Sequence, residues 1–109
     1  MDAREAPQLV LDWDDRQWLL GDEDQILLGS ADAVDLGVAG ECTSRFHARI
    51  ERRKDCYVLI DHSTNGTFIQ TEDEQVKFLR RAEMRLWGDG WIALGQLPSI
   101  ESAIHFRHS

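Results

Sequence analysis

The chain has 109 residues, of which 42% are hydrophobic and 29% are charged, and its formal net charge is −8. This length suits a single domain around one core, and the negative charge argues against nucleic acid or an anionic membrane as a partner. No apolar run approaches the ~18 residues of a transmembrane helix, and the polar, acidic N-terminus lacks the pattern of a signal peptide. We therefore expect a cytoplasmic protein.

Short apolar or alternating runs, separated by Gly, Asp, Asn or Ser, recur along the chain and are typical of β-strands. We predict strands, in chain order, at residues 8–13, 16–20, 25–29, 34–37, 46–52, 56–61, 67–70, 76–79, 83–87, 91–95 and 102–107. Turn signals at Asp14-Asp15 and Lys54-Asp55 predict two tight hairpins. About eleven short strands at this spacing indicate an all-β fold, an antiparallel β-sandwich or barrel. Residues 1–7 are expected to be a flexible remnant ahead of a folded domain at 8–109.

Side-chain alternation in the strand at 46–52 predicts which of its residues share a face. Phe46, Ala48 and Ile50 are expected on one face. His47, Arg49 and Glu51 are expected on the other.

The tryptophans are numerous for a chain of this length. We expect Trp91 in the core, whereas Trp13 and Trp18 flank an acidic hairpin and are candidates for a partly exposed interface. Trp87 and the edge of the last predicted strand, at 102–107, are the candidates for self-association.

Cationic residues cluster between positions 45 and 54 of an otherwise acidic chain, namely Arg45, Arg49, Arg52, Arg53 and Lys54. Such a compact basic region suits a local anionic ligand better than a polyanion. The alternative, for most of these side chains, is a solvated strand face.

Two predicted loops, 42–45 and 62–66, concentrate polar side chains. Loops at one end of an antiparallel sandwich gather into one surface, where Ser44 and Thr64 supply hydroxyls and Asn65 a carboxamide. Arg45 adds a planar cation. This set suits a phosphate on an extended peptide, because hydroxyls and guanidinium can hold the phosphate while the carboxamide bonds the peptide backbone. Asn-Gly and Asp-x-Ser are also ordinary turn signals, so a purely structural 62–66 loop is the alternative.

The stretches "SRFHARI", "DHSTNGTFI" and "GDGWIALG", in this order, resemble the forkhead-associated (FHA) domain over about residues 8–107. The resemblance implies a β-sandwich that binds phosphothreonine peptides at one loop end, without catalytic residues, cofactor or metal. It implies that the peptide contacts come from Ser44, Arg45, Thr64 and Asn65. It also implies that three residues support the binding loops, which are Gly29, His47 and Gly66.

One position departs from the FHA pattern. The family's Gly-Arg pair is Gly29-Ser30 here, so the main cationic contact to the phosphate is missing. Removing one partner of a buried charge pair costs about 2–5 kcal/mol. Arg45 is expected to compensate in part, Arg49 is a further candidate, and Ser30 is expected to donate a weak hydrogen bond. Binding of a phosphothreonine-containing partner is therefore our prediction, and phosphate-independent docking or self-association by the same fold is the alternative.

The C-terminal half is also similar to FHA domains at the C-terminus of bacterial class III adenylate/guanylate cyclases. The stretches that carry this resemblance are "ERRKDCYVLIDHSTNGTFI", "FLRRAEMRLWGDGWIALGQ" and "AIHFRH". It implies a regulatory role within a larger signalling protein, with the parent chain itself as a candidate partner, and no cyclase chemistry in this chain.

A zinc site is an alternative that the cysteines raise. Cys42, His47, Cys56 and His62 are suitable ligand types, but their spacing differs from that of usual zinc motifs. We expect Cys42 and Cys56 to be reduced thiols of a cytosolic domain. A disulfide between them is left open.

A hydrolase is a further alternative, because Asp61, His62 and Ser63 include the residue types of a catalytic triad. Successive residues of a strand project to opposite faces, which does not suit a proton relay. We expect no enzymatic activity.

Overall fold

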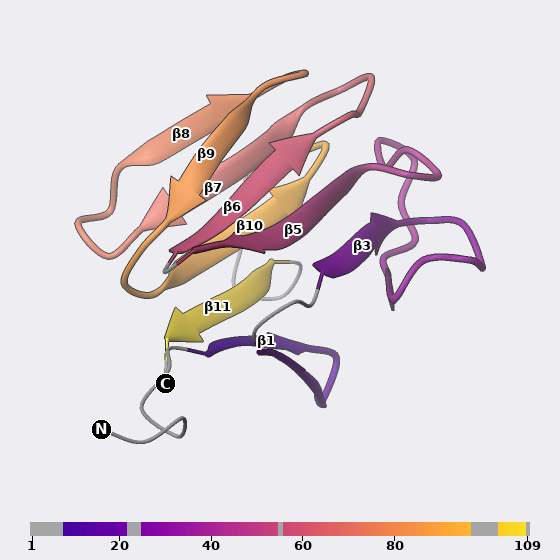
Figure 1. Ribbon diagram of the computed structural model, residues 1–109. Helices are drawn as coiled ribbons and strands as arrows, with labels where there is room; N and C mark the ends of the chain where they lie inside the picture. Colours follow the sequence, from indigo (N-terminus) through magenta and orange to yellow (C-terminus); the bar gives the residue numbers. More distant parts are fainter. Residues whose placement is uncertain (1–7, 22–24, 55, 97–102, 109) are drawn as a thin grey trace, which may run out of the picture.

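The computed structural model describes residues 8–21, 25–54, 56–96 and 103–108, and these residues form eleven β-strands (Figure 1). Within these ranges no helix is long and apolar enough to cross a membrane. The strands are β1 (Leu9–Trp13), β2 (Arg16–Leu20), β3 (Gln25–Gly29), β4 (Leu36–Gly37), β5 (Ala48–Arg53), β6 (Cys56–Asp61), β7 (Thr67–Thr71), β8 (Val76–Leu79), β9 (Glu83–Leu86), β10 (Gly90–Leu94) and β11 (Ile104–His108).

The strands form two sheets, and the predicted all-β sandwich is confirmed. A six-stranded sheet has the order β2-β1-β11-β10-β7-β8, and a five-stranded sheet has the order β4-β3-β5-β6-β9. Every pairing is antiparallel except that of β3 with β4, which is parallel. Only residues 36 and 37 of the predicted strand at 34–37 join a sheet.

The core lies between the sheets and is built from alternating apolar residues. Leu11, Ile92 and Phe106 of the larger sheet and Ile50 and Leu59 of the smaller one are fully buried members of one cluster. Burying each such side chain stabilises the fold by roughly 1.5–3 kcal/mol.

The alternation predicted at 46–52 holds from Ala48 onward but is wrong for the two residues before it. Phe46 was expected to share a face with the buried Ala48 and Ile50 but is 54% exposed, whereas His47, expected on the opposite face, is fully buried. The reason is that β5 begins at Ala48, so residues 46 and 47 still belong to the preceding loop and do not follow the strand's alternation.

Two further expectations are corrected. Trp91, expected in the core, is half-buried on the outer face of its sheet, with its ring centroid 4.5 Å from that of His105, because its neighbour Ile92 takes the inward position. The last strand has no free edge, since β11 lies between β1 and β10. Trp87 is 56% exposed, and both Trp13 and Trp18 pack partly buried against the core.

Two tight turns were predicted from the sequence. Asp14 and Asp15 connect β1 to β2 with φ of 51° and 61°, as the predicted hairpin requires. Lys54 also has a positive φ of 56°. Its partner in the second predicted turn, Asp55, and the expected flexible segment 1–7 lie outside the described residues.

The pairing registers place the polar loops at one end of the sandwich. The start of β5 faces the end of β6 through Ala48 and Asp61, and the start of β7 faces the end of β10 through Thr67 and Leu94. We call this end, with residues 38–47, 62–66, 80–82 and 95–96, the loop end. At the opposite end, which we call the terminal end, Leu9 pairs with His108.

Candidate functional site

His47 ties the two predicted binding loops together from inside the molecule. Its Nδ1 accepts a hydrogen bond from the backbone N–H of Ser44 at 3.0 Å, so the ring proton must reside on Nε2. Nε2 then donates to the carbonyl of Gly66 at 2.8 Å. The same carbonyl accepts from the backbone N–H of Gly95 at 2.9 Å. One neutral imidazole therefore fixes the position of loop 42–47 against loop 62–66.

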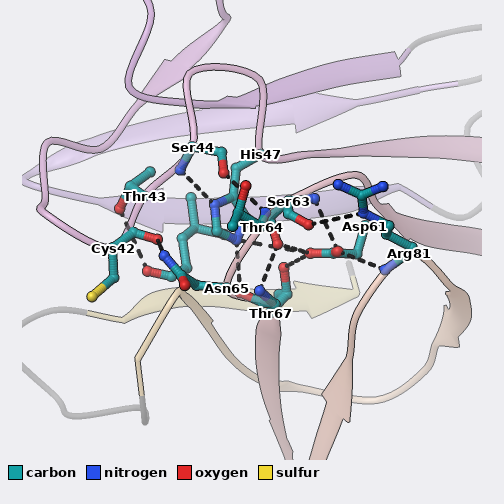
Figure 2. Close-up of polar contacts among 12 residues, drawn as sticks. Cys42, Thr43, Ser44, His47, Asp61, Ser63, Thr64, Asn65, Thr67 and Arg81 are labelled. Carbon is teal, nitrogen blue, oxygen red and sulfur yellow. Dashed lines mark hydrogen bonds and ion pairs between the residues drawn. The ribbon is translucent and has the colours of Figure 1, made fainter.

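Asp61 organises the second loop from its base (Figure 2). Its carboxylate accepts hydrogen bonds from the hydroxyls of Ser63 at 2.8 Å and Thr67 at 2.6 Å. It also accepts from the backbone N–H groups of Ser63 at 3.0 Å and Arg81 at 2.9 Å. Ser63 Oγ in turn accepts from the N–H of Gly66 at 2.7 Å. Local bonding at Asp-x-Ser was a sequence signal, but the contributions of Thr67 and Arg81 were missed.

The polar groups predicted to contact a ligand come together at the loop end. Ser44 Oγ accepts a hydrogen bond from the backbone N–H of Thr64 at 3.2 Å. The carboxamide of Asn65 donates to the carbonyl of Cys42 at 3.2 Å. Thr64 and Asn65 are exposed and Ser44 is half-buried. Figure 2 shows all three at the junction of the two loops, where a bound chain can reach them.

Ser30 and Arg45 lie beside this junction. The N–H of Ser30 donates to the carbonyl of Ser44 at 3.0 Å, and its hydroxyl donates to the carbonyl of Thr43 at 3.4 Å. The exposed guanidinium of Arg45 has neither a hydrogen bond nor an ion pair with any other described residue. Its charge is therefore available to a ligand.

Gly29 and Gly66 have steric reasons to be glycine. A Cβ on Gly29 would lie 2.1 Å from the carbonyl oxygen of Arg45, because the 42–47 loop packs directly on the end of β3. Gly66 has a φ of +89°, and a Cβ there would lie 2.3 Å from the ring of Phe78. Both glycines thus allow the loops to pack closely.

The arrangement shifts the pKa values of its two buried ionisable groups. Burial lowers the pKa of His47 below its usual value, although the Gly66 carbonyl and the charge of Asp61 partly oppose the shift. Burial by itself raises the pKa of Asp61, but hydrogen bonds from Thr67, Arg81 and Ser63 outweigh this effect and leave the pKa lowered. A neutral imidazole thus lies 3.8 Å from an ionised carboxylate.

The zinc alternative finds no support in this geometry. Both ring nitrogens of His47 are engaged by backbone groups. Cys42 and Cys56 are free thiols, and because they lie at the loop end and the terminal end respectively, they cannot form the disulfide that was left open. No group of three or more potential metal ligands is found among the described residues.

The triad alternative fails for a similar reason. Ser63 Oγ donates to Asp61 and not to His62. The imidazole of His62 accepts a hydrogen bond from Arg49 at 2.7 Å through Nε2. Serine and histidine are therefore engaged with different partners.

Comparison with known proteins connects this geometry to one family. A family model for the FHA domain matches residues 26–86. Comparison of the sequence with curated proteins found no match.

Several solved structures share the fold. The FHA-1 domain of Rv1747 from Mycobacterium tuberculosis is 18% identical with a TM-score of 0.72, over 95% of this chain and 98% of that chain. An FHA domain from a study of phosphothreonine-dependent FHA domain interactions is 24% identical with a TM-score of 0.67, over 92% and 95%. EmbR of Mycobacterium tuberculosis, in complex with a low-affinity phosphopeptide, is 20% identical with a TM-score of 0.66, over 93% of this chain and 24% of that chain. At these identities the likeness concerns the fold.

Proposed function

Since this chain belongs to the FHA domain family, whose model matches residues 26–86 of its 109, we propose that it is a non-catalytic module that binds a phosphothreonine-containing protein segment at its loop end. The observation that carries this proposal is the convergence of Ser44, Thr64 and Asn65 beside the guanidinium of Arg45, which pairs with no other residue in the described part of the chain. Hydroxyls and a guanidinium suit a phosphate, and an exposed carboxamide suits a peptide backbone.

The related structures support the choice of ligand. One was solved in a study of phosphothreonine-dependent interactions, and another in complex with a phosphopeptide. The proposed roles in this chain are phosphate contact by Ser44, Arg45 and Thr64, and backbone contact by Asn65. His47, Gly29 and Gly66 act only by supporting these loops.

Ser30 weakens the proposed phosphate contact. It lies next to Ser44, where the family pattern has an arginine, and its hydroxyl can donate only one hydrogen bond. Arg45 supplies the remaining charge from an exposed position. We therefore expect an affinity for phosphothreonine peptides below that of a domain with the complete Gly-Arg pair.

The test is a fluorescence-anisotropy titration with degenerate threonine peptides, phosphorylated and unphosphorylated. We expect the phosphorylated pool to bind more tightly. The affinity for this pool should fall about tenfold or more in Ser44→Ala and in Asn65→Ala, since each substitution removes a hydrogen-bonding group from the ligand contact. Thr71→Ala, at the terminal end, serves as the control that keeps the affinity. Equal binding of both pools would refute recognition of the phosphate.

Phosphate-independent docking or self-association by the same fold is the second candidate function, and Ser30 is the observation that favours it. It predicts that a partner binds equally well with and without phosphothreonine. The peptide titration therefore separates the two candidates.

We further propose that the module works within a larger signalling protein in the cytoplasm. Free thiols at Cys42 and Cys56 suit a reducing compartment. The similarity of the C-terminal half to cyclase-associated FHA domains makes a nucleotidyl cyclase the candidate parent, and a segment of that parent a candidate ligand.

A further inference from the structure

A hollow lies on the other flank of the 62–66 loop from Cys42. It has a volume of about 510 Å³ and is lined by Ile60, Asp61, His62, Arg81, Ala82 and Glu83. We call it the Arg81 hollow. Figure 2 shows the Arg81 guanidinium beside Ser63, on the side away from Cys42, Thr43 and Asn65. The hollow is therefore continuous with the proposed binding loop.

The two carboxylates of the Arg81 hollow already have donors. Asp61 is only 1% exposed and accepts the hydrogen bonds of Ser63, Thr67 and the Arg81 backbone described above. Glu83 accepts two hydrogen bonds from the guanidinium of Arg53, at 2.5 and 3.1 Å. Neither carboxylate is left to neutralise a further cation.

The Arg81 guanidinium, in contrast, has little engagement. Within the described part of the chain it makes one long hydrogen bond, from Nε to the carbonyl of Ser63 at 3.5 Å, and its terminal nitrogens make none. Arg49 is already engaged, because it forms an ion pair with Glu51 at 3.6 Å and donates to Nε2 of His62. That bond places the proton of the neutral His62 ring on Nδ1. The hollow is thus lined by one largely unengaged guanidinium and an imidazole N–H.

Arg81 is held in place by its backbone. It has a φ of 54°, and its N–H is fixed by the buried carboxylate of Asp61. Fixing the backbone in advance reduces the entropy lost when the side chain orders around a ligand. The side chain is exposed, so a ligand can reach it.

We propose that the Arg81 hollow binds an anionic side chain of the partner segment whose phosphothreonine occupies the neighbouring loops. The chemistry is that of an oxyanion, a carboxylate or a second phosphate, on a guanidinium. This inference rests on the proposed function, and it offsets part of the affinity lost with Ser30. It predicts that the module prefers phosphothreonine segments with acidic or doubly phosphorylated flanks.

The first test compares three labelled phosphothreonine peptide pools whose flanking positions hold glutamine, glutamate or phosphoserine. We expect the two anionic pools to bind about three- to tenfold more tightly than the glutamine pool, the range of a partly exposed charge-assisted contact. Arg81→Asn should abolish this gain, taken within each variant as the ratio of the affinities for the anionic and the glutamine pools, and it should still fold, because asparagine tolerates a positive φ. Lys77→Gln, in the other sheet, removes the same charge from an exposed position and should keep the gain. The relative gains of the glutamate and phosphoserine pools distinguish the two anions.

The second test uses inorganic phosphate and nuclear magnetic resonance. We expect phosphate to shift the signals of His62 and of the Arg81 side chain in the wild type, and the shift at His62 to vanish in Arg81→Asn. An equal gain in wild type and Arg81→Asn, or phosphate shifts that spare both residues, would overturn the inference. If phosphorylated and unphosphorylated pools instead bind equally, the proposed function fails. The titration with inorganic phosphate would still test separately whether the Arg81 hollow binds an anion.

Discussion

At the scale of single residues, the candidate site depends on two buried ionisable groups. His47 joins the carbonyl of one loop to the N–H of the other, and Asp61 fixes the second loop through its hydroxyl and N–H groups. His47 and Asp61 thereby fix the loops that carry Ser44 and Asn65, two of the residues proposed to contact a ligand. Changes at the buried pair should therefore alter binding as well as stability.

Replacing Ser30 with arginine should restore the cation that the family pattern has at this position. Ser30 is exposed and its backbone bonds the carbonyl of Ser44, so a longer side chain has room and starts next to the proposed phosphate site. We expect Ser30→Arg to bind phosphothreonine peptides at least about thirtyfold more tightly, which corresponds to the lower end of the about 2–5 kcal/mol of a buried charge pair. Anisotropy titration measures this, with Ser30→Gln as the uncharged control. Unchanged affinity in the arginine variant would place the phosphate elsewhere.

Acidification should loosen the loop end through His47. Because the pKa of folded His47 is lowered by burial, the unfolded chain takes up the proton at a higher pH than the folded one. The stability that neutral His47 contributes is thus complete above its ordinary pKa of about 6.5 and is lost as pH falls through the lower folded value. Protonation would also remove the acceptor of the Ser44 N–H.

We accordingly expect the melting temperature and the phosphopeptide affinity to fall together between pH 7.5 and pH 5. Thermal melts and peptide titrations at both pH values measure this. A variant with His105→Gln and His108→Gln should retain the effect, since both of these histidines lie on β11 and outside the loop junction. If the pH dependence disappeared in that variant, a replaced histidine and not His47 would be responsible for it.

Asp61→Asn should be strongly destabilising despite its small change in shape. An amide would turn one acceptor into a donor that faces the N–H groups of Ser63 or Arg81. Leaving such buried groups unpaired costs about 2–4 kcal/mol. Urea denaturation measures the loss, and Asp73→Asn is the matched control, because Asp73 accepts similar bonds from Thr71 and Gln75 at an exposed turn. Equal losses in both variants would contradict the role given to burial.

At the scale of elements, the turn between β6 and β7 has tight steric limits. Its Gly66 combines a positive φ with contact to Phe78 and the Leu79 carbonyl of β8, so this turn and the edge strand β8 fit only without a side chain. The turn is therefore specified by the neighbouring strand as well as by its own residues.

Gly66→Ala should destabilise the domain by about 1–3 kcal/mol, through the strained backbone and the displaced β8. Gly37→Ala is the matched control, since a Cβ at Gly37 meets nothing within 4 Å, and it should be nearly neutral. Chemical denaturation of both variants gives the comparison. A cost for Gly37→Ala as large as that for Gly66→Ala would show that the loss reflects glycine removal in general.

The elements were largely predictable from the sequence, because alternation is a local property of each strand. The exceptions follow from long-range contacts. Phe46 and His47 leave the alternation because the 42–47 loop packs on the end of β3 and ties back to Gly66. The parallel pairing of β3 with β4 rests on two residue pairs. No pattern in "ADAVDLG" predicts this pairing.

The candidate site was predictable only in part. Ser44, Thr64 and Asn65 were located by resemblance to a family pattern, and Asp-x-Ser predicts a local turn. The contact of Arg81 with Asp61 joins residues 20 positions apart and exists only because β6 and β9 are neighbours. The Arg81 hollow depends on the same pairing, so the sequence alone offers no signal for it.

At the scale of the whole molecule, the sandwich separates its two ends by function. All residues proposed to bind a ligand lie at the loop end. At the terminal end, β1 begins and β11 ends, and Leu9 pairs there with His108. Polypeptide attached to either of these strands would leave the molecule on the side away from the ligand.

The adjacency of Leu9 and His108 also means that the order of the strands along the chain can be changed without changing the fold. A short glycine-rich bridge would join the two strands into a closed ring, and a cut in the exposed turn at 72–75 would provide new ends far from the loop end. We expect such a circularly permuted variant to fold and to retain ligand affinity, which a melting curve and a peptide titration would measure. Loss of affinity in a folded permutant would mean that the binding loops depend on the continuity of the chain as well as on their packing.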